Sequence, residues 1–379
     1  MSITFTAQDT KFTVKDNWAS SNVFQVKSTP RPYNVIWYES GAPYERINKL
    51  LAENPKNLLF IDENVFRLHG KKIKISKDRL FIAKATEEFK TLFGVIKLID
   101  FLQTKEITKG EKLIVVGGGI IQDIGAFAGI AYKRGIPWTY FPSTLLSMCD
   151  SCIGAKAGVN HNKAKNQVCL FSSPSEVIIN PAFLKTLPQK DLRSGLGEIL
   201  KLYIIGGNKF IDIYNKSVVK GNVKKFGDYK KLILGSLHVK KEVIELDEFE
   251  KNHRKVLNYG HTLGHAIESM SGYEITHGQG VALGMLLVNE FSCNRGFLPA
   301  NSKIMLENLI NDLFDKKVIS IMRKLSVVQL AGLLKKDKKT LGNTLSFAIL
   351  ADIGNIRLLP LNIDDALCSE IEAIIKKFF

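Results

Sequence analysis

The stretch that decides the fold covers residues 112–129 and reads KLIVVGGGIIQDIGAFAG. Its first part, residues 113–116, is a short apolar run of the kind that forms a buried strand. Three glycines follow, and the chain then continues with small and apolar residues that suit a helix. Glycines between a strand and a helix let backbone N–H groups approach a phosphate at the positive end of the helix. The stretch lacks the G-x-G-x-x-G spacing, so it predicts either a phosphate-binding loop or an ordinary tight turn.

Runs on the N-terminal side of this stretch extend the same pattern. The first 35 residues alternate apolar and polar side chains, as half-exposed strands or a hairpin would. Further short apolar runs predict strands at residues 35–37, 58–61 and 80–82. An amphipathic segment at residues 87–103 separates the last of these from the glycine stretch. Strands that alternate with helices predict a parallel α/β sheet.

After about Pro181 the pattern becomes helical. Helices are expected at residues 191–205, 230–248, 261–270, 280–295 and 303–313, and an apolar piece at residues 344–350 is expected to be a strand or an extended segment. A chain of 379 residues is also longer than one hydrophobic core usually serves. We therefore predict an α/β N-terminal domain over residues 1–182 and a mainly α-helical C-terminal domain over residues 183–379.

Composition narrows the partners. The chain is 45% hydrophobic and 24% charged, as in ordinary soluble globular proteins, and its formal net charge of +16 favours an anionic partner. We find no zinc-finger, RNA-recognition or basic-zipper pattern, which argues against nucleic acid. The most apolar stretch, residues 113–132, contains glycines and a Gln-Asp pair that a membrane span would not tolerate. Five dispersed cysteines and a start without a signal pattern favour a reducing, cytoplasmic location. The net positive charge then favours a phosphorylated small molecule as the anionic partner.

Histidines gather in one part of the chain. His261 and His265 are four residues apart and would share one face of a helix, and His277 follows shortly after. Glu198 lies on an earlier predicted helix. A histidine pair at this spacing is more often packed or capping than metal-bound, so both interpretations stay open on spacing alone.

An ordered series of motifs follows the glycine stretch: YKRG at 132–135, FPSTLL at 141–146, Asp150, Lys156 with GVN at 158–160, KNQ at 165–167, FLKTLP at 183–188 and SGLGEILK at 194–201. Together they resemble the central signature of the 3-dehydroquinate synthase family, within the sugar phosphate cyclases. The resemblance is continuous over residues 116–284. It implies a Rossmann-like NAD-binding domain followed by a mainly helical metal-binding domain.

The resemblance assigns NAD contacts to residues of the first domain. They are Asp62, Asn64, Glu87, Lys90, Gly118, Gly119, Asp123, Ser143, Thr144, Asp150, Lys165 and Thr186. Within this set, the spacing of Glu87 and Lys90 is also common on plain helix surfaces, so a surface pair is the alternative there.

The resemblance also implies a metal and a substrate site. Glu198, His261 and His277 would bind a divalent cation (zinc, cobalt or another) and leave positions open for substrate hydroxyls. Arg254 and Lys240 match residues that meet a substrate carboxylate. The remaining catalytic contacts are Asp150, Lys156, Asn166, Lys201, Asn258, His265 and Lys338, with Arg134 from the neighbouring subunit of a homodimer.

The activity that the resemblance implies is conversion of 3-deoxy-arabino-heptulosonate 7-phosphate into 3-dehydroquinate and phosphate, with NAD reduced and reoxidised on the way. The alternatives are a cyclase of another heptulose phosphate, such as sedoheptulose 7-phosphate, and a metal- and NAD-dependent polyol dehydrogenase. The retained Arg254 favours an acidic substrate, because an unpaired buried arginine is costly. The sequence departs from the family pattern at Gln122, Ala155, Ala157 and residues 168–174, which leaves the heptulose phosphate open.

Overall fold

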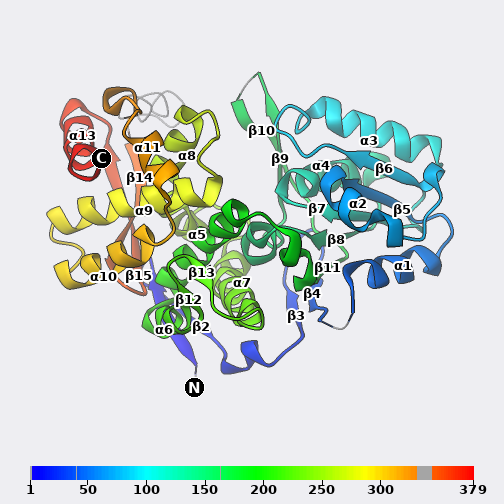
Figure 1. Ribbon diagram of the computed structural model, residues 1–379, viewed down its shortest axis with the longest axis horizontal. Helices are drawn as coiled ribbons and strands as arrows, with labels where there is room; N and C mark the ends of the chain where they lie inside the picture. Colours follow the sequence, from blue (N-terminus) through cyan, green and yellow to red (C-terminus); the bar gives the residue numbers. More distant parts are fainter. Residues whose placement is uncertain (1, 40, 163, 331–343) are drawn as a thin grey trace. The chain divides into compact units, whose positions relative to one another are not determined.

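The computed structural model describes residues 2–39, 41–162, 164–330 and 344–379 (Figure 1). They form two compact units: Ser20–Leu187, here called the α/β unit, and Met1–Ala19 with Pro188–Phe379, here called the helical unit. This division differs from the predicted one in two respects. The boundary follows Leu187 rather than residue 182, and the first residues of the chain belong with its C-terminal part.

The α/β unit is built on a seven-stranded sheet with the order β3-β4-β11-β8-β7-β5-β6. Strand β3 is antiparallel to β4, and the other neighbours are parallel. The predicted strands at residues 35–37, 58–61, 80–82 and 113–116 are confirmed. The strands are β3 (Val23–Val26), β4 (Tyr33–Trp37), β5 (Leu58–Asp62), β6 (Leu80–Ala83), β7 (Leu113–Gly117), β8 (Trp138–Pro142) and β11 (Glu176–Ile179).

Strand β7 is buried at every position, as its uninterrupted apolar run requires. It pairs with β8 on one side and β5 on the other. The unit also contains α1 (Pro43–Glu53), α2 (Glu63–His69), α3 (Leu92–Thr104), α4 (Gly119–Ala131) and an antiparallel hairpin of β9 (Lys156–His161) and β10 (Ala164–Phe171). The amphipathic segment predicted at 87–103 becomes helical only at Leu92, because Thr91 before it is fully extended.

The helical unit confirms the predicted helices with shifts of a few residues at their ends. It contains α5 (Gln189–Gly206), α6 (Asn208–Ser217), α7 (Asp228–Leu246), α8 (His261–Met270), α9 (His277–Asn294), α10 (Ala300–Asn311), α11 (Lys316–Met322) and α13 (Asp365–Phe378). Over the described ranges, no helix has both the length and the apolar character needed to cross a membrane.

A four-stranded sheet explains why the N-terminus belongs to this unit. Its order is β14 (Thr344–Asp352), β15 (Asn355–Asn362), β1 (Ile3–Ala7) and β2 (Thr10–Val14). Strands β1 and β2 form the hairpin expected from the alternating pattern. Strand β1 also pairs in parallel with β15, near the other end of the chain. A short hairpin of β12 (Val218–Val219) and β13 (Asn222–Val223) completes the strands described in the unit.

Candidate metal and cofactor sites

Glycines let three helices of the helical unit approach closely. A Cβ atom added to Gly278 on α9 would lie 1.7 Å from the Ser194 carbonyl oxygen on α5. A Cβ atom on Gly197 would lie 2.2 Å from the Gly278 oxygen, and one on Gly284 would lie 1.9 Å from the Gly260 oxygen. Real side chains do not reach such distances, so these contacts require glycine.

This packing brings together side chains that sit beside the glycines in sequence. Glu198 on α5 follows Gly197, and His277 at the start of α9 precedes Gly278. The Oε1 atom of Glu198 lies 3.2 Å from Nε2 of His277 and 3.5 Å from Nε2 of His261. The glutamate and the two histidines of the predicted metal set therefore converge.

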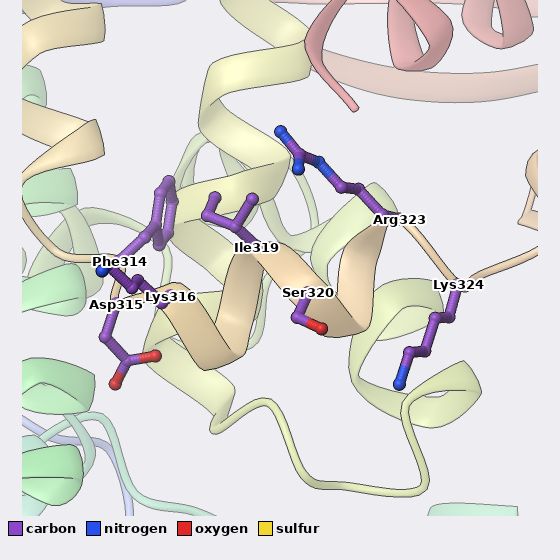
Figure 2. Close-up of a pocket in the computed structure, with 7 residues that line it drawn as sticks. All are labelled: Phe314, Asp315, Lys316, Ile319, Ser320, Arg323 and Lys324. Atoms are coloured by element: carbon purple, nitrogen blue, oxygen red, sulfur yellow. The ribbon is translucent and has the colours of Figure 1, made fainter.

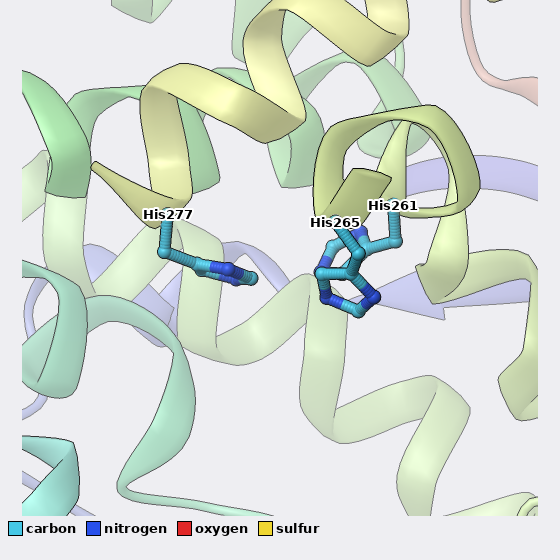
Figure 3. A group of neighbouring side chains, drawn as sticks. All are labelled: His261, His265 and His277. Atoms are coloured by element: carbon cyan, nitrogen blue, oxygen red, sulfur yellow. The ribbon is translucent and has the colours of Figure 1, made fainter. Parts of the chain in front are cut away.

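A third imidazole lies beside this set. The ring of His277 points toward those of His261 and His265, both of which come from α8 (Figure 3). The ring centroid of His265 lies 5.3 Å from that of His261 and 5.5 Å from that of His277. One ring nitrogen from each of the three histidines lies within 4.8 Å of the other two. Two overlapping ligand sets are therefore present: the three histidines, and Glu198 with His261 and His277.

Charges around Glu198 set the protonation of the cluster. Burial alone would raise the pKa of Glu198, but Lys201 and the two imidazoles hold the pKa of this carboxyl well below its usual range. Burial, followed by the charge of Lys201, lowers the pKa of His261 well below its usual value. Burial also acts to lower the pKa of His277, but hydrogen bonds to Glu198 and Glu268 outweigh it and raise this pKa to about 9. The carboxylate is therefore ionised, as a metal ligand must be, whereas His277 holds a proton near neutral pH that a bound cation would displace.

The donor set fits a divalent cation of the zinc type. Both oxygens of Glu198 are fully buried, with the Lys201 ammonium 2.5 Å from Oε2 and Nε2 of His277 3.2 Å from Oε1. A buried ionised carboxylate is costly unless cations compensate it, and Lys201 does so at Oε2, whereas Oε1 faces the two imidazoles that would share a metal ion with it. Two imidazoles and one carboxylate are the ligands of open, catalytic zinc sites.

Sequence reasoning missed one residue of this cluster. Glu268 on α8 is buried, and its Oε2 atom lies 3.2 Å from Nδ1 of His277. The available signal was its place in the motif GHAIE, two turns after His261 on the same helix face. That signal did not indicate its partner, because His277 belongs to another helix.

The glycine stretch of the α/β unit forms a strand–loop–helix junction. Gly118 is the N-cap of α4 and, as a glycine, supplies no side-chain cap to the first N–H groups of this helix. A Cβ atom on Gly118 would lie 3.0 Å from the Thr144 methyl, whereas one on Gly119 would find its nearest neighbour, the Ser151 hydroxyl, at 3.9 Å. Uncapped N–H groups beside an open glycine surface fit a phosphate of a dinucleotide.

A polar cluster lies around Asp123 on α4. The Lys90 ammonium is 2.5 Å from the Asp123 carboxylate and donates to Asn166 Oδ1 at 2.8 Å. Glu87 pairs with Lys165 at 3.1 Å and accepts a hydrogen bond from Asn160 at 2.7 Å. Burial raises the pKa of Asp123 in spite of the opposing charge of Lys90.

Several predicted residues are thereby united. Glu87, Lys90, Asp123, Lys165 and Asn166 belong to one network, in which Asn160 Oδ1 also accepts from the Asn166 backbone at 3.0 Å. The alternative of an ordinary surface pair for Glu87 and Lys90 does not hold for Lys90, because Lys90 is buried. The network gives this part of the predicted cofactor site a defined shape.

Other predicted cofactor residues make local contacts. Asp62 caps α2 by accepting from the Asn64 and Val65 backbone N–H groups at 2.7 and 3.2 Å, and its pKa is raised, mainly by burial. The hydroxyls of Thr144 and Ser147 lie 2.8 Å apart, and Thr186 donates to the Phe183 carbonyl at 3.2 Å. Ser143 is buried, its N–H donates to the Gly117 carbonyl at 2.9 Å, and Asp150 is half-buried.

Two departures from the family pattern have structural consequences. Gln122 on α4 donates to the Ser151 carbonyl and accepts from the Ser151 hydroxyl, both at 2.7 Å. It thus fixes the turn at Ser147–Ser151 against the helix. Ala155 has a φ of 56°, in the left-handed region that favours glycine.

The predicted carboxylate contacts lie on or after α7. Arg254 is buried, and its guanidinium donates to the Glu248 carbonyl. Asp247 holds the loop before it by accepting from three backbone N–H groups, including that of Arg254 at 3.0 Å. These bonds lower the pKa of Asp247 against the effect of burial. Lys240 on α7 is buried as well.

The other predicted catalytic residues are more exposed. Asn258 is exposed and donates to Glu250 at 2.8 Å, and the other exposed residues of this set are His265, Lys156, Asn166 and Arg134. Arg134 follows α4 in a turn with a φ of 59°. Lys338 lies outside the described residues.

A pocket of about 580 Å³ lies along α11 (Figure 2). It is lined by Phe314, Asp315, Lys316, Ile319, Ser320, Arg323 and Lys324. All of these belong to one short segment, and none is a predicted site residue.

Solved structures identify the class of fold. The chain superimposes on 2-deoxy-scyllo-inosose synthase complexed with carbaglucose-6-phosphate, NAD+ and Co2+ with a TM-score of 0.80 at 22% identity, covering 94% of this chain and all of that one. For 2-epi-5-epi-valiolone synthase from Streptomyces hygroscopicus, with NAD+ and Zn2+ bound, the TM-score is 0.74 at 23% identity, covering 94% and 99% of the two chains. The fold is that of the sugar phosphate cyclases, as expected.

Sequence comparison gives the family. Residues 80–194 match the family model described as 3-dehydroquinate synthase N-terminal, and residues 195–340 match the C-terminal one. A 3-dehydroquinate synthase from Alkaliphilus metalliredigens is 36% identical over 331 residues, which is 86% of this chain and 92% of that protein. One from Streptococcus pneumoniae is 31% identical over 324 residues, 83% and 90% of the two chains. The chain belongs to the 3-dehydroquinate synthase family, which confirms the resemblance.

Proposed function

We propose that the chain is a 3-dehydroquinate synthase. It converts 3-deoxy-arabino-heptulosonate 7-phosphate into 3-dehydroquinate and phosphate, and it uses NAD and a divalent cation, zinc or cobalt. The observation that carries the proposal is the approach of two imidazole Nε2 atoms, from His261 and His277, to the buried carboxylate of Glu198. In a member of this family, that convergence supplies a metal centre of the catalytic type.

Glu198, His261 and His277 are assigned as the metal ligands. When bound, the cation would polarise a substrate oxygen, and NAD would accept and return a hydride. Lys201 holds a positive charge 2.5 Å from Glu198 and is assigned, with Asp150, to the substrate hydroxyls near the metal. His265 is assigned to a proton transfer or a phosphate contact.

The cations of the chain are assigned to the two acidic ends of the substrate. Arg254 and Lys240 are both buried and would pair with the carboxylate. A fixed cation also stabilises the leaving phosphate as it gains charge. The residues assigned to the phosphate are Lys156, Asn166, Asn258, His265, Lys338 and, from the second subunit of a homodimer, Arg134.

The cofactor is assigned to the α/β unit. The pyrophosphate would lie on Gly118 and Gly119 at the uncapped N-terminus of α4. The network of Glu87, Lys90, Asp123 and Lys165 would orient the nicotinamide half. The further contacts assigned to NAD are Asp62, Asn64, Ser143, Thr144, Asp150 and Thr186. We also expect a cytoplasmic homodimer that has neither nucleic acid nor membrane as a partner.

Turnover with defined substrates tests the proposal. The purified protein is incubated with NAD, zinc and either 3-deoxy-arabino-heptulosonate 7-phosphate or sedoheptulose 7-phosphate. We expect phosphate and a carbocyclic product from the acidic substrate, without net NADH. A preference for sedoheptulose 7-phosphate would identify a different cyclase, and net NADH from a polyol would indicate a dehydrogenase; either result contradicts the proposal.

A further inference from the structure

We propose that Glu268 is a positioning residue of the metal site: its carboxylate fixes the tautomer and the orientation of the His277 imidazole. The inference rests on the proposed function, because it assumes that His277 binds the cation. Glu268 is not among the residues that the family resemblance assigned to the site.

The His277 ring lies between two carboxylates, one at each nitrogen. Its Nδ1 atom is 3.2 Å from Oε2 of Glu268, and its Nε2 atom is 3.2 Å from Oε1 of Glu198. The Glu268 side chain is about one-tenth exposed, so water competes little for this contact. A shielded carboxylate therefore defines which way the ring faces.

A carboxylate at Nδ1 also determines which ring nitrogen of His277 keeps its proton. Ionised carboxylates only accept hydrogen bonds, so each nitrogen of His277 faces an acceptor. Glu268 would keep the proton on Nδ1 when a cation takes the place of the proton on Nε2, so the lone pair offered to the metal is the one on Nε2. His261 has the same arrangement, with Nδ1 lying 3.3 Å from the Tyr259 carbonyl oxygen and Nε2 facing Glu198. Both imidazoles are thus directed at one point by an acceptor behind them.

Glycine packing places Glu268 within reach. A Cβ atom added to Gly280 on α9 would lie 3.7 Å from Cβ of Glu268, and one added to Gly264 on α8 would lie 2.8 Å from the Gly280 oxygen. Helices α8 and α9 therefore cross closely enough for a glutamate on one to meet the first residue of the other.

Metal affinity tests the inference directly. Zinc affinity is measured by competition with a chelator on the metal-free protein, for the wild type and Glu268→Gln. A glutamine can donate to Nδ1 and so permit the wrong tautomer, and it lacks the charge. We expect zinc to bind 10- to 100-fold more weakly. The matched control is Glu274→Gln, because Glu274 pairs with Lys317 at 3.0 Å on the surface. The zinc affinity of this variant should equal that of the wild type.

The outcomes separate the two proposals. If the wild type binds one zinc ion tightly and Glu268→Gln binds it equally well, the role of Glu268 is wrong while the metal site stands. If the wild type binds no zinc, both are wrong. A positioning role also predicts that kcat recovers substantially at saturating zinc. If Glu268→Gln fails to fold, Glu268→Asp carries the test: an intermediate loss of affinity supports the inference, and unchanged affinity overturns it.

Discussion

Nε2 of His277 lies 3.2 Å from Oε1 of Glu198, although the two residues come from different helices. The distance follows from backbone contacts directly beside them, where Gly278 meets Ser194 and Gly197. The N–H group of Gly278 also donates to the Ser194 hydroxyl at 3.0 Å. The metal site is therefore built on glycine packing as much as on its ligands.

Replacing Gly278 by alanine should disrupt this packing. The new Cβ atom would meet backbone at 1.7 Å, so α9 must shift. Overpacking of this kind costs about 1–3 kcal/mol or more of unfolding free energy. Because His277 moves with α9, zinc affinity should fall at least tenfold. Urea unfolding and zinc titration measure the two effects.

The control is Gly227→Ala, since a Cβ atom there would have no neighbour within 4 Å. It should leave both stability and zinc affinity within error of the wild type. Unchanged zinc affinity in folded Gly278→Ala would show that glycine packing does not set the ligand geometry.

Replacing Lys90 by methionine should leave Asp123 without its nearest cation. Breaking one side of a buried ion pair costs about 3–5 kcal/mol, and this partly exposed pair should cost less, about 2 kcal/mol near pH 7. Burial already raises the pKa of Asp123 in the folded state, and loss of Lys90 raises it further. Because the folded pKa of Asp123 lies above its unfolded value in both proteins, the penalty should be complete near pH 8, shrink as pH falls through the raised folded pKa of the variant, and be lost near pH 4.

Urea unfolding of the wild type and Lys90→Met at several pH values checks this prediction. Lys112→Met is the matched control, because Lys112 pairs with Glu53 at 3.5 Å in an exposed position. A penalty for Lys90→Met that stays constant between pH 4 and 8 would contradict the assigned role of Asp123.

Replacing Ala155 by glycine should stabilise the α/β unit. Ala155 has a φ of 56°, which an L-residue adopts only at a cost, and the glycine variant should gain about 0.5–1 kcal/mol. Ala157→Gly, in the following strand, is the control and should lose stability, because it removes a buried methyl without relieving strain. Thermal unfolding measures both, and a destabilised Ala155→Gly would refute the strain at this position.

Replacing Arg254 by alanine should discriminate between substrates. We expect kcat/KM for 3-deoxy-arabino-heptulosonate 7-phosphate to fall roughly 10- to 100-fold more than that for a heptulose phosphate without a carboxylate. Arg295→Ala is the control, because Arg295 pairs with Glu370 at 2.7 Å and has no assigned role. Equal losses of kcat/KM on both substrates for Arg254→Ala would refute the assignment of Arg254 to the substrate carboxylate.

Local patterns in the sequence predicted most of the regular structure. The apolar runs that became β5 and β7 are buried throughout, so they carry a clear signal. The hairpin of β9 and β10 was not predicted, because β10 is half-exposed and mixes polar with apolar residues. The pairing of β1 with β15 joins the two ends of the chain, and no local pattern can indicate it.

The same limit applies to the sites. Spacing within one helix put His261 and His265 on a common face, but only the family resemblance singled out Glu198 and His277. Their convergence depends on how α5, α8 and α9 pack, which adjacent glycines control. Glu268 was missed for this reason, since its partner lies across the α8–α9 contact.

The identity of the ligands is the central claim, and anomalous X-ray diffraction at the zinc edge tests it most directly. Crystals of the protein with zinc should give one peak about 2.0–2.2 Å from a Glu198 oxygen and from Nε2 of His261 and His277. A peak held by His261, His265 and His277 without Glu198, or no peak among these residues, would contradict the account.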